Sequence, residues 1–164
     1  MPTTQDDVRD FLVQRRIALV GLSRNPKDFS HVVFREMSQW GYDMVPVNPA
    51  GGELEHRRCF ARLQEIDPPV AGALVMTAPR ETERVVRDCA EAGVRRVWMH
   101  RGGGQGAVSK QAADFCRQNG IRLVEGYCPL MFLTGTPILH RVHGFFLKVL
   151  GGYPARARDL AHPV

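Results

Sequence analysis

The sequence predicts an α/β fold built on one parallel sheet of about five strands, doubly wound with helices on both faces. Short apolar, partly β-branched runs alternate with longer segments of helical periodicity. Glycine follows several of the helical segments, as is typical of helix C-termini. The run from Gly72 to Met76 is almost wholly apolar, which indicates a strand buried on both faces. Together these features are typical of a Rossmann-like fold.

The elements follow in order along the chain. We expect strands at 17–20, 42–47, 72–76, 96–99 and 121–124. Helices are expected at 4–15, 81–92 and 109–118, and from a cap at Ser30 to Gly41, with a short helix at 60–66 and a surface loop at 51–58. The alternation predicts the sheet order 3-2-1-4-5, counting strands along the chain.

The end of the chain departs from this alternation. We expect a domain over residues 1–133 and a C-terminal extension over 134–164, with an extra apolar helix at 137–150. That helix would pack on the domain or across a homodimer. The alternative is a basic amphipathic helix on a membrane surface, with Arg141 and Lys148 on its polar side.

Composition excludes several classes. The 164 residues carry a formal charge of +5 without a basic run, which suits a small anionic ligand better than nucleic acid. No apolar stretch reaches membrane-span length. The four cysteines form no C-x-x-C pair, and no signal peptide precedes them, so reduced thiols in a cytoplasm are expected. His140 and His143 share a spacing that suits a metal but have no evident third ligand, so no metal site is predicted.

The candidate binding crevice lies where the parallel strands end. Ligands of open α/β sheets bind outside the carboxyl ends of the strands, at the point where the strand order reverses. Gly21 allows a tight turn there, and Ser23 offers a hydroxyl donor. Ser30 and the following N–H groups would form a helix end suited to phosphate. Arg24 and Lys27 add charge, or are merely solvated loop cations.

The end of the second strand bears on which nucleotide is bound. An NAD site places an acidic residue there for the ribose hydroxyls, whereas this chain has Asn48 and no acid before Glu53. A neutral amide would not repel a phosphorylated ribose. The sequence therefore favours NADP, or a ligand with a 3′-phospho-ADP group such as coenzyme A (CoA).

Three segments carry a family resemblance: G-L-S-R-N-P with the following Ser30, G-Y-D-M-V-P-V-N-P, and W-M-H at the end of the fourth strand. Over about residues 8–133 the chain resembles the small stand-alone CoA-binding proteins, which are similar to the CoA-binding domain of the succinyl-CoA synthetase α subunit. The resemblance implies CoA or acyl-CoA as the ligand. The candidate binding residues, from the crevice and the resemblance together, are Gly21, Ser23, Arg24, Asn25, Lys27, Ser30, Asn48, Pro49, Thr77, Ala78, Pro79, Met99 and His100.

Two positions depart from the family pattern, and neither points to a reaction. Asp28 stands where relatives often carry Arg, and His100 where they commonly carry Gln. His100 could act as a general base, but a hydrogen-bonding role in the pocket wall is favoured. Cys128 could pair with a ligand thiol, but a buried hydrophobic role is favoured.

The sequence thus favours a cytoplasmic binding or regulatory protein and leaves enzymatic activity open. One alternative is a small NADP-binding oxidoreductase. The other is a protein-interaction module that has kept the fold without a ligand.

Overall fold

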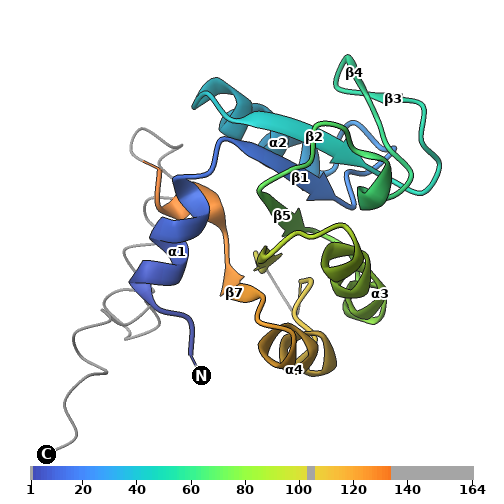
Figure 1. The fold of residues 1–164 in the computed structure, drawn as a ribbon. Helices are drawn as coiled ribbons and strands as arrows, with labels where there is room; N and C mark the ends of the chain where they lie inside the picture. The colour runs from blue at the N-terminus through green and yellow to red at the C-terminus, as the bar shows by residue number, and fades with distance from the viewer. Residues whose placement is uncertain (1, 103–105, 134–164) are drawn as a thin grey trace, which may run out of the picture.

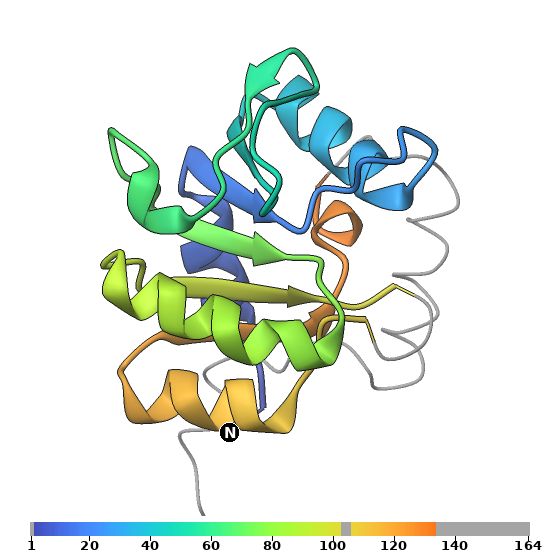
Figure 2. The ribbon, with the colours of Figure 1, turned by 90° about the vertical axis from the view of Figure 1, so that its right-hand side faces the viewer.

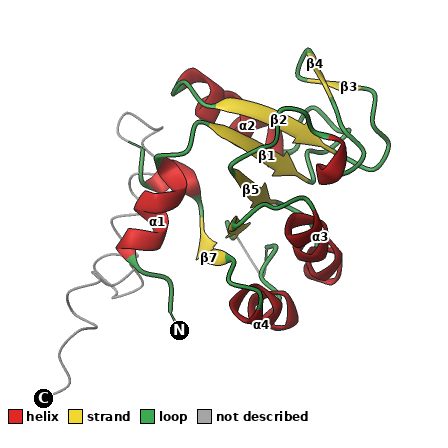
Figure 3. Ribbon diagram, viewed as in Figure 1, coloured by secondary structure: helices red, strands yellow, loops and turns green. Residues whose placement is uncertain are grey.

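The computed structural model describes residues 2–102 and 106–133. One five-stranded sheet lies between helices, with a small hairpin at one end (Figures 1 and 3). The helices are α1 (Gln5–Leu12), α2 (Phe29–Gln39), α3 (Pro79–Glu91) and α4 (Lys110–Gln118), with 3₁₀ turns η1 (Leu63–Glu65) and η2 (Pro129–Met131). The strands are β1 (Arg16–Val20), β2 (Asp43–Val47), β3 (Glu53–Leu54), β4 (Arg57–Arg58), β5 (Gly72–Val75), β6 (Arg96–His100) and β7 (Arg122–Tyr127).

The fold class is confirmed, but the expected strand order needs correction. The sheet is parallel throughout, in the order β2-β1-β5-β6-β7. Counted along the chain as the five expected strands, this is 2-1-3-4-5 and not 3-2-1-4-5. The third strand, β5, pairs with β1, with Leu19 opposite Leu74. The direction of winding therefore reverses between β1 and β5.

Pro46 explains why β2 lies at the edge. Proline has no N–H to donate to a sheet, so within strands it is confined to edges and bulges. Pro46 pairs with Leu19 of β1 on one side, and on the other its carbonyl accepts from the N–H of Phe60 at 3.0 Å. Among the described residues, one isolated bridge, between Val47 and Phe60, flanks β2 on that side. A third strand beyond β2 would need the N–H that Pro46 lacks.

Each face of the sheet has its own core, because side chains alternate along the strands. Ile17 and Leu19 of β1 face α1 and α2, where Trp98 and Phe11 are also fully buried. Ala18 and Val20 face the other side, where α3, α4 and η1 pack. Figure 2 shows α3 and α4 in front of the sheet and α1 behind it.

Local signals set most of the helix boundaries. Thr4 and Asp7 form a capping box at α1. Ser109 caps α4 through the N–H of Ala112. The prediction of Ser30 as the cap of α2 is wrong, because Asp28 occupies the N-cap and α2 begins at Phe29.

The segment between β2 and β5 holds the other corrections. The expected surface loop at 51–58 contains the β3–β4 hairpin, and the expected helix at 60–66 is only the 3₁₀ turn η1. The hairpin turn places Glu55 and His56 at φ values of 52° and 57°. Two-residue hairpin turns of this hand usually contain Gly or Asn, and neither residue is present at positions 55 and 56 to indicate the turn.

Some predictions fall outside the described residues. These are the expected helix at 137–150, the extension over 134–164 with His140 and His143, and the centre of the glycine-rich loop at 103–105. Within the described ranges, no helix is long and apolar enough to cross a membrane.

Candidate functional site

The carboxyl ends of β1, β2, β5 and β6 meet at one edge of the sheet, since all these strands are parallel. The crossover after β1 leads to β2 on one side, and those after β5 lead to β6 and β7 on the other. The turns after β1 and β5 are therefore neighbours at the switch point, where ligands of such sheets bind. The candidate residues from Gly21 to Ser30 and from Thr77 to Pro79 lie in these two turns and at the starts of the helices that follow them.

Gly21 lies close to the turn after β5. Its φ is +94°, and a Cβ there would lie 2.9 Å from Thr77 Cγ2 and 3.0 Å from the Met76 carbonyl oxygen. Its N–H donates to the carbonyl of Val47 at 3.0 Å. Only glycine fits both this conformation and this approach. The ends of β1, β2 and β5 are thereby held together at one point.

The loop after Gly21 is ordered by its own polar groups. The Ser23 N–H donates to Ser30 Oγ, and Ser23 Oγ accepts from the Asn25 N–H, both at 3.1 Å. Asn25 Oδ1 in turn accepts from the N–H of Lys27 at 3.1 Å. The ammonium of Lys27 lies on an exposed residue, and no ion pair to it is present within the described part of the chain. Lys27 is thus the candidate cation of this loop that the fold leaves available.

Asp28 places a negative charge at the N-terminus of α2. Its carboxylate accepts from the Ser30 N–H at 2.9 Å and from the Ser30 hydroxyl at 2.6 Å. These hydrogen bonds, that of the hydroxyl first, lower the pKa of Asp28, so it is ionised at neutral pH. Ser30 and the first turn of α2, predicted to meet an anion, already meet a carboxylate of the protein itself.

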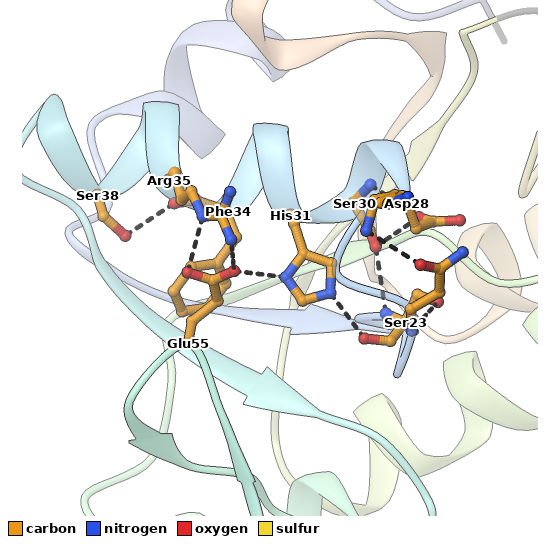
Figure 4. Close-up of polar contacts among 10 residues, drawn as sticks. Ser23, Asp28, Ser30, His31, Phe34, Arg35, Ser38 and Glu55 are labelled. Atoms are coloured by element: carbon orange, nitrogen blue, oxygen red, sulfur yellow. Dashed lines mark hydrogen bonds and ion pairs between the residues drawn. The ribbon is translucent and has the colours of Figure 1, made fainter.

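A polar chain connects this loop to the β3–β4 hairpin (Figure 4). The ring of His31 contacts the Ser23 carbonyl through Nε2 at 2.8 Å and Glu55 Oε1 through Nδ1. Arg35, one turn further along α2, donates from Nε to Glu55 Oε2 at 2.9 Å. Hydrogen bonds from Arg35 and then His31 lower the pKa of Glu55. Sequence reasoning missed His31 and Glu55, since nothing in the sequence placed residue 55 beside α2.

Arg24 and Asn48 also bind protein groups. The Arg24 guanidinium donates to the Gly51 carbonyl and, at 3.5 Å, to that of Glu53, at the base of the hairpin. Asn48 donates from Nδ2 to the Leu22 carbonyl at 2.9 Å and accepts from the Ala50 N–H at 3.0 Å. Both side chains join the end of β2 and the hairpin to the β1 turn.

The turn after β5 differs from the turn after β1 in how the helix that follows it is capped. Thr77 Oγ1 lies 3.0 Å from Thr82 Oγ1, and Thr82 donates to the Ala107 carbonyl at 2.9 Å. Ala78 is the N-cap of α3 and makes no side-chain capping bond, and Pro79 is the first helical residue. The α3 N-terminus thus carries no capping carboxylate.

The end of β6 reaches the start of α2. Met99 is fully buried and His100 is 6% exposed. The His100 ring lies 5.9 Å from the ring of Phe29, between centroids. The candidate residues at the end of β6 are therefore brought to the same edge as the loop after β1.

A cleft opens on the α3 side of the two turns. It has a volume of about 70 Å³ and is lined by Gly21, Pro49 and Thr77, together with charged side chains from α3 and from the residue before η1. Those side chains include Arg62 and Arg84, which sequence reasoning missed because their approach depends on how α3 and the segment around η1 pack over the sheet. Arg62 pairs with Asp88 at 2.9 Å. Glu81 and Asp88 also line the cleft, so each of its two arginines has a carboxylate nearby.

The cysteines of this domain are buried, unreactive thiols. Burial raises the pKa of Cys128 to about 11 and that of Cys116 to about 12. A neutral thiol is a poor nucleophile, so the favoured role of Cys128 as a small buried hydrophobe fits its environment. Among the described residues, no three His, Cys, Asp or Glu side chains are grouped to hold a metal.

Known proteins share this fold and sequence pattern. An uncharacterized Bacillus subtilis protein, YneT, is 30% identical over 114 residues, which cover 70% of this chain and 82% of YneT. The α subunit of ADP-forming acetate–CoA ligase II from Pyrococcus furiosus is 24% identical over 125 residues, 72% of this chain but 27% of that subunit. A hypothetical protein from Pyrococcus horikoshii OT3 superimposes with a TM-score of 0.71 and 26% identity, over 79% of this chain and 91% of that one. The protein-family model described as a CoA binding domain matches residues 15–134. This chain therefore belongs to the CoA-binding domain family.

Proposed function

We propose that this protein binds coenzyme A, free or acylated, at the sheet edge where the turns after β1 and β5 meet. The observation that carries the proposal is the contact of Gly21 with Thr77 at the switch point, within a chain that belongs to the CoA-binding domain family. The acetate–CoA ligase subunit, by its name part of an enzyme that uses CoA, supports the same ligand for the segment that this chain shares with it.

The geometry indicates which candidate residues would contact the ligand directly. Lys27 is exposed at the loop and can meet a phosphate, and the Ser23 hydroxyl retains its proton for donation. Thr77 and Pro49 line the cleft beside Gly21. By contrast, Arg24, Asn48 and Ser30 would act indirectly, because their hydrogen bonds hold the loop after β1 in place. Met99 and His100 would form the side of the binding site at the end of β6.

The proposal is for a binding or regulatory role. The buried cysteines have raised pKa values and offer no thiolate nucleophile. The chain spans 27% of the ligase subunit, so the activity of that enzyme would need parts that the shared segment does not include.

Native mass spectrometry of freshly purified protein tests the ligand class. We expect a mass increment that matches CoA or an acyl-CoA, which would also identify the acyl group. An NADP-sized increment would replace the proposal with the NADP-binding alternative. If the protein is purified without ligand, titrations with CoA, dephospho-CoA and NADPH show which of these ligands it binds. Binding of CoA with weaker binding of dephospho-CoA supports recognition of the phosphorylated ribose, and no saturable binding of any of the three overturns the proposal.

A further inference from the structure

His31 occupies an unusual position between the loop of the proposed site and the hairpin. Only 4% of its side chain is exposed, and both ring nitrogens face oxygen atoms. One oxygen belongs to the Glu55 carboxylate and the other to the backbone carbonyl of Ser23. Neither group has a proton to donate, since Glu55 has a lowered pKa and a carbonyl only accepts.

This environment defines the protonation state of the ring. A neutral imidazole has one N–H and one lone pair, so one of its nitrogens would face an oxygen without a proton between them. A protonated ring donates to both oxygens. The charged groups around it are Glu55 from the hairpin, Arg35 through Glu55, and Asp28 at the N-cap of α2. The two carboxylates favour the cationic ring, and Arg35 opposes it.

The contact with Ser23 orients the next peptide group. In a trans peptide the carbonyl of one residue and the N–H of the next point in opposite directions. Because the Ser23 carbonyl points to His31, the Arg24 N–H points away from that ring. No hydrogen bond from the Arg24 backbone N–H to another described residue is present. It is therefore a donor that the loop can offer to an anion.

The conformation of the β3–β4 hairpin turn supports the contact between Glu55 and His31. Glu55 adopts a positive φ of 52°, which non-glycine residues rarely adopt. Glycine would fit that turn position more easily but would have no carboxylate for His31 and Arg35. The Arg24 side chain ties the base of the same hairpin to the loop through the carbonyls of Gly51 and Glu53. The hairpin thus holds the loop at two points.

We propose that protonated His31 is a positioning residue for the ligand loop: it joins the hairpin to the Ser23 carbonyl and so turns the Arg24 N–H toward a phosphate of the ligand. Its role in binding rests on the proposed function, whereas the bracing of the loop does not. Loss of the ring proton would leave one ring nitrogen without a hydrogen to donate, which would break one of the two contacts and loosen the loop.

The test compares His31→Gln with His56→Gln, a neighbouring exposed histidine in the hairpin turn. Hydrogen–deuterium exchange of residues 21–31 in the free protein and CoA affinity are both measured from pH 5.5 to 8.5. In the wild type we expect the rate of amide exchange in this segment, corrected for its intrinsic pH dependence, to rise as the pH rises. We expect the affinity for CoA to fall over the same range. His31→Gln should lose about tenfold in affinity at low pH, as for a hydrogen bond to a charged group, and should flatten both profiles. His56→Gln should follow the wild type.

The outcomes separate the two proposals. If the wild type binds no CoA, the proposed function fails, and the exchange data alone still decide the bracing by His31. If loop exchange in His31→Gln equals that of the wild type at every pH, the inference is overturned even when CoA binds. Glu55→Gln serves as a milder second variant if His31→Gln does not fold, and it should show the same loss of pH dependence.

Discussion

The first turns of α2 and α3 occupy equivalent places, each following a strand that ends at the switch point, yet they are built in opposite ways. At α2, the Asp28 carboxylate caps the helix and His31 ties the preceding loop to the hairpin. At α3, Ala78 provides no side-chain cap and Pro79 begins the helix. Topology therefore locates a binding edge, whereas the capping residues decide which helix end can attract an anion.

The difference between the two helix N-termini bears on where the phosphates of CoA would bind. The positive end of α2 is already neutralised by a carboxylate with a lowered pKa. The corresponding end of α3 has no capping carboxylate and lies beside Thr77 at the cleft. The Glu81 carboxylate in its first turn lies 3.8 Å from Arg80 and 3.9 Å from Arg84. We therefore expect the ligand phosphates to depend on the loop donors and Lys27 on one side and on the α3 N-terminus on the other.

The largest effect should come from separating the two turns. Gly21→Ala places a Cβ within 3.0 Å of Met76 and Thr77 at positive φ, and we expect a loss of about 2–4 kcal/mol in unfolding free energy. Gly41→Ala is the matched control, because Gly41 has a similar φ of +86° and no neighbouring atom within 4 Å. It should lose only about 1 kcal/mol in urea unfolding. Equal losses would show that the close contact between the turns is unimportant.

A carboxylate at the α3 N-cap should give the next largest effect. Ala78→Asp should raise the melting temperature by capping α3 and weaken CoA binding about five- to tenfold by placing a negative charge where phosphates approach. Ala78→Ser supplies a capping oxygen without the charge, so it should raise stability with little effect on titrated affinity. Equal affinities in the two variants would place the phosphates away from α3.

The reverse change at α2 should have a smaller effect. Asp28→Asn keeps a capping oxygen and removes the charge, so we expect CoA affinity to rise about two- to fivefold. Asp6→Asn removes an exposed charge from the first turn of α1 and should leave affinity unchanged. Unchanged affinity in Asp28→Asn would mean that the bound phosphates do not sense the α2 N-terminus.

The smallest effect concerns acid stability. The folded-state pKa of Glu55 is lowered, chiefly by its hydrogen bond from Arg35, so the ionised carboxylate stabilises the folded protein. That contribution is complete above the ordinary value of 4.5 and is lost as pH falls through the lower folded-state value. Melting temperatures from pH 3 to 7 should therefore fall less steeply on the acid side for Glu55→Gln than for the wild type. Parallel curves would contradict a stabilising role for the ionised form.

The sequence predicted the fold class, and it predicted that the candidate residues lie at one edge of the sheet, because both depend on local patterns. Apolar strand runs and the Gly21 turn are visible without tertiary information. The strand order was mispredicted even though Pro46 in the second strand indicates an edge. The preference for Ser30 over Asp28 as helix cap was also wrong, since both residue types cap well and only the register of α2 decides between them.

The remaining features arise from contacts between distant segments. His31 and Glu55 are 24 residues apart and meet only because the hairpin turns at two non-glycine residues with positive φ. Arg62 and Arg84 reach the cleft through the packing of η1 and α3. Neither arrangement follows from periodicity or local propensity, so a single sequence could not reveal them.

Isothermal titration of CoA into the wild type, Ser23→Asn and Ser23→Asp tests the binding edge most directly. The two variants have side chains of nearly the same shape and differ in charge at the loop after β1. We expect one saturable site in the wild type, retained in Ser23→Asn and lost or strongly weakened in Ser23→Asp. No saturable binding by the wild type, or equal binding by Ser23→Asp, would contradict CoA recognition at this edge of the sheet.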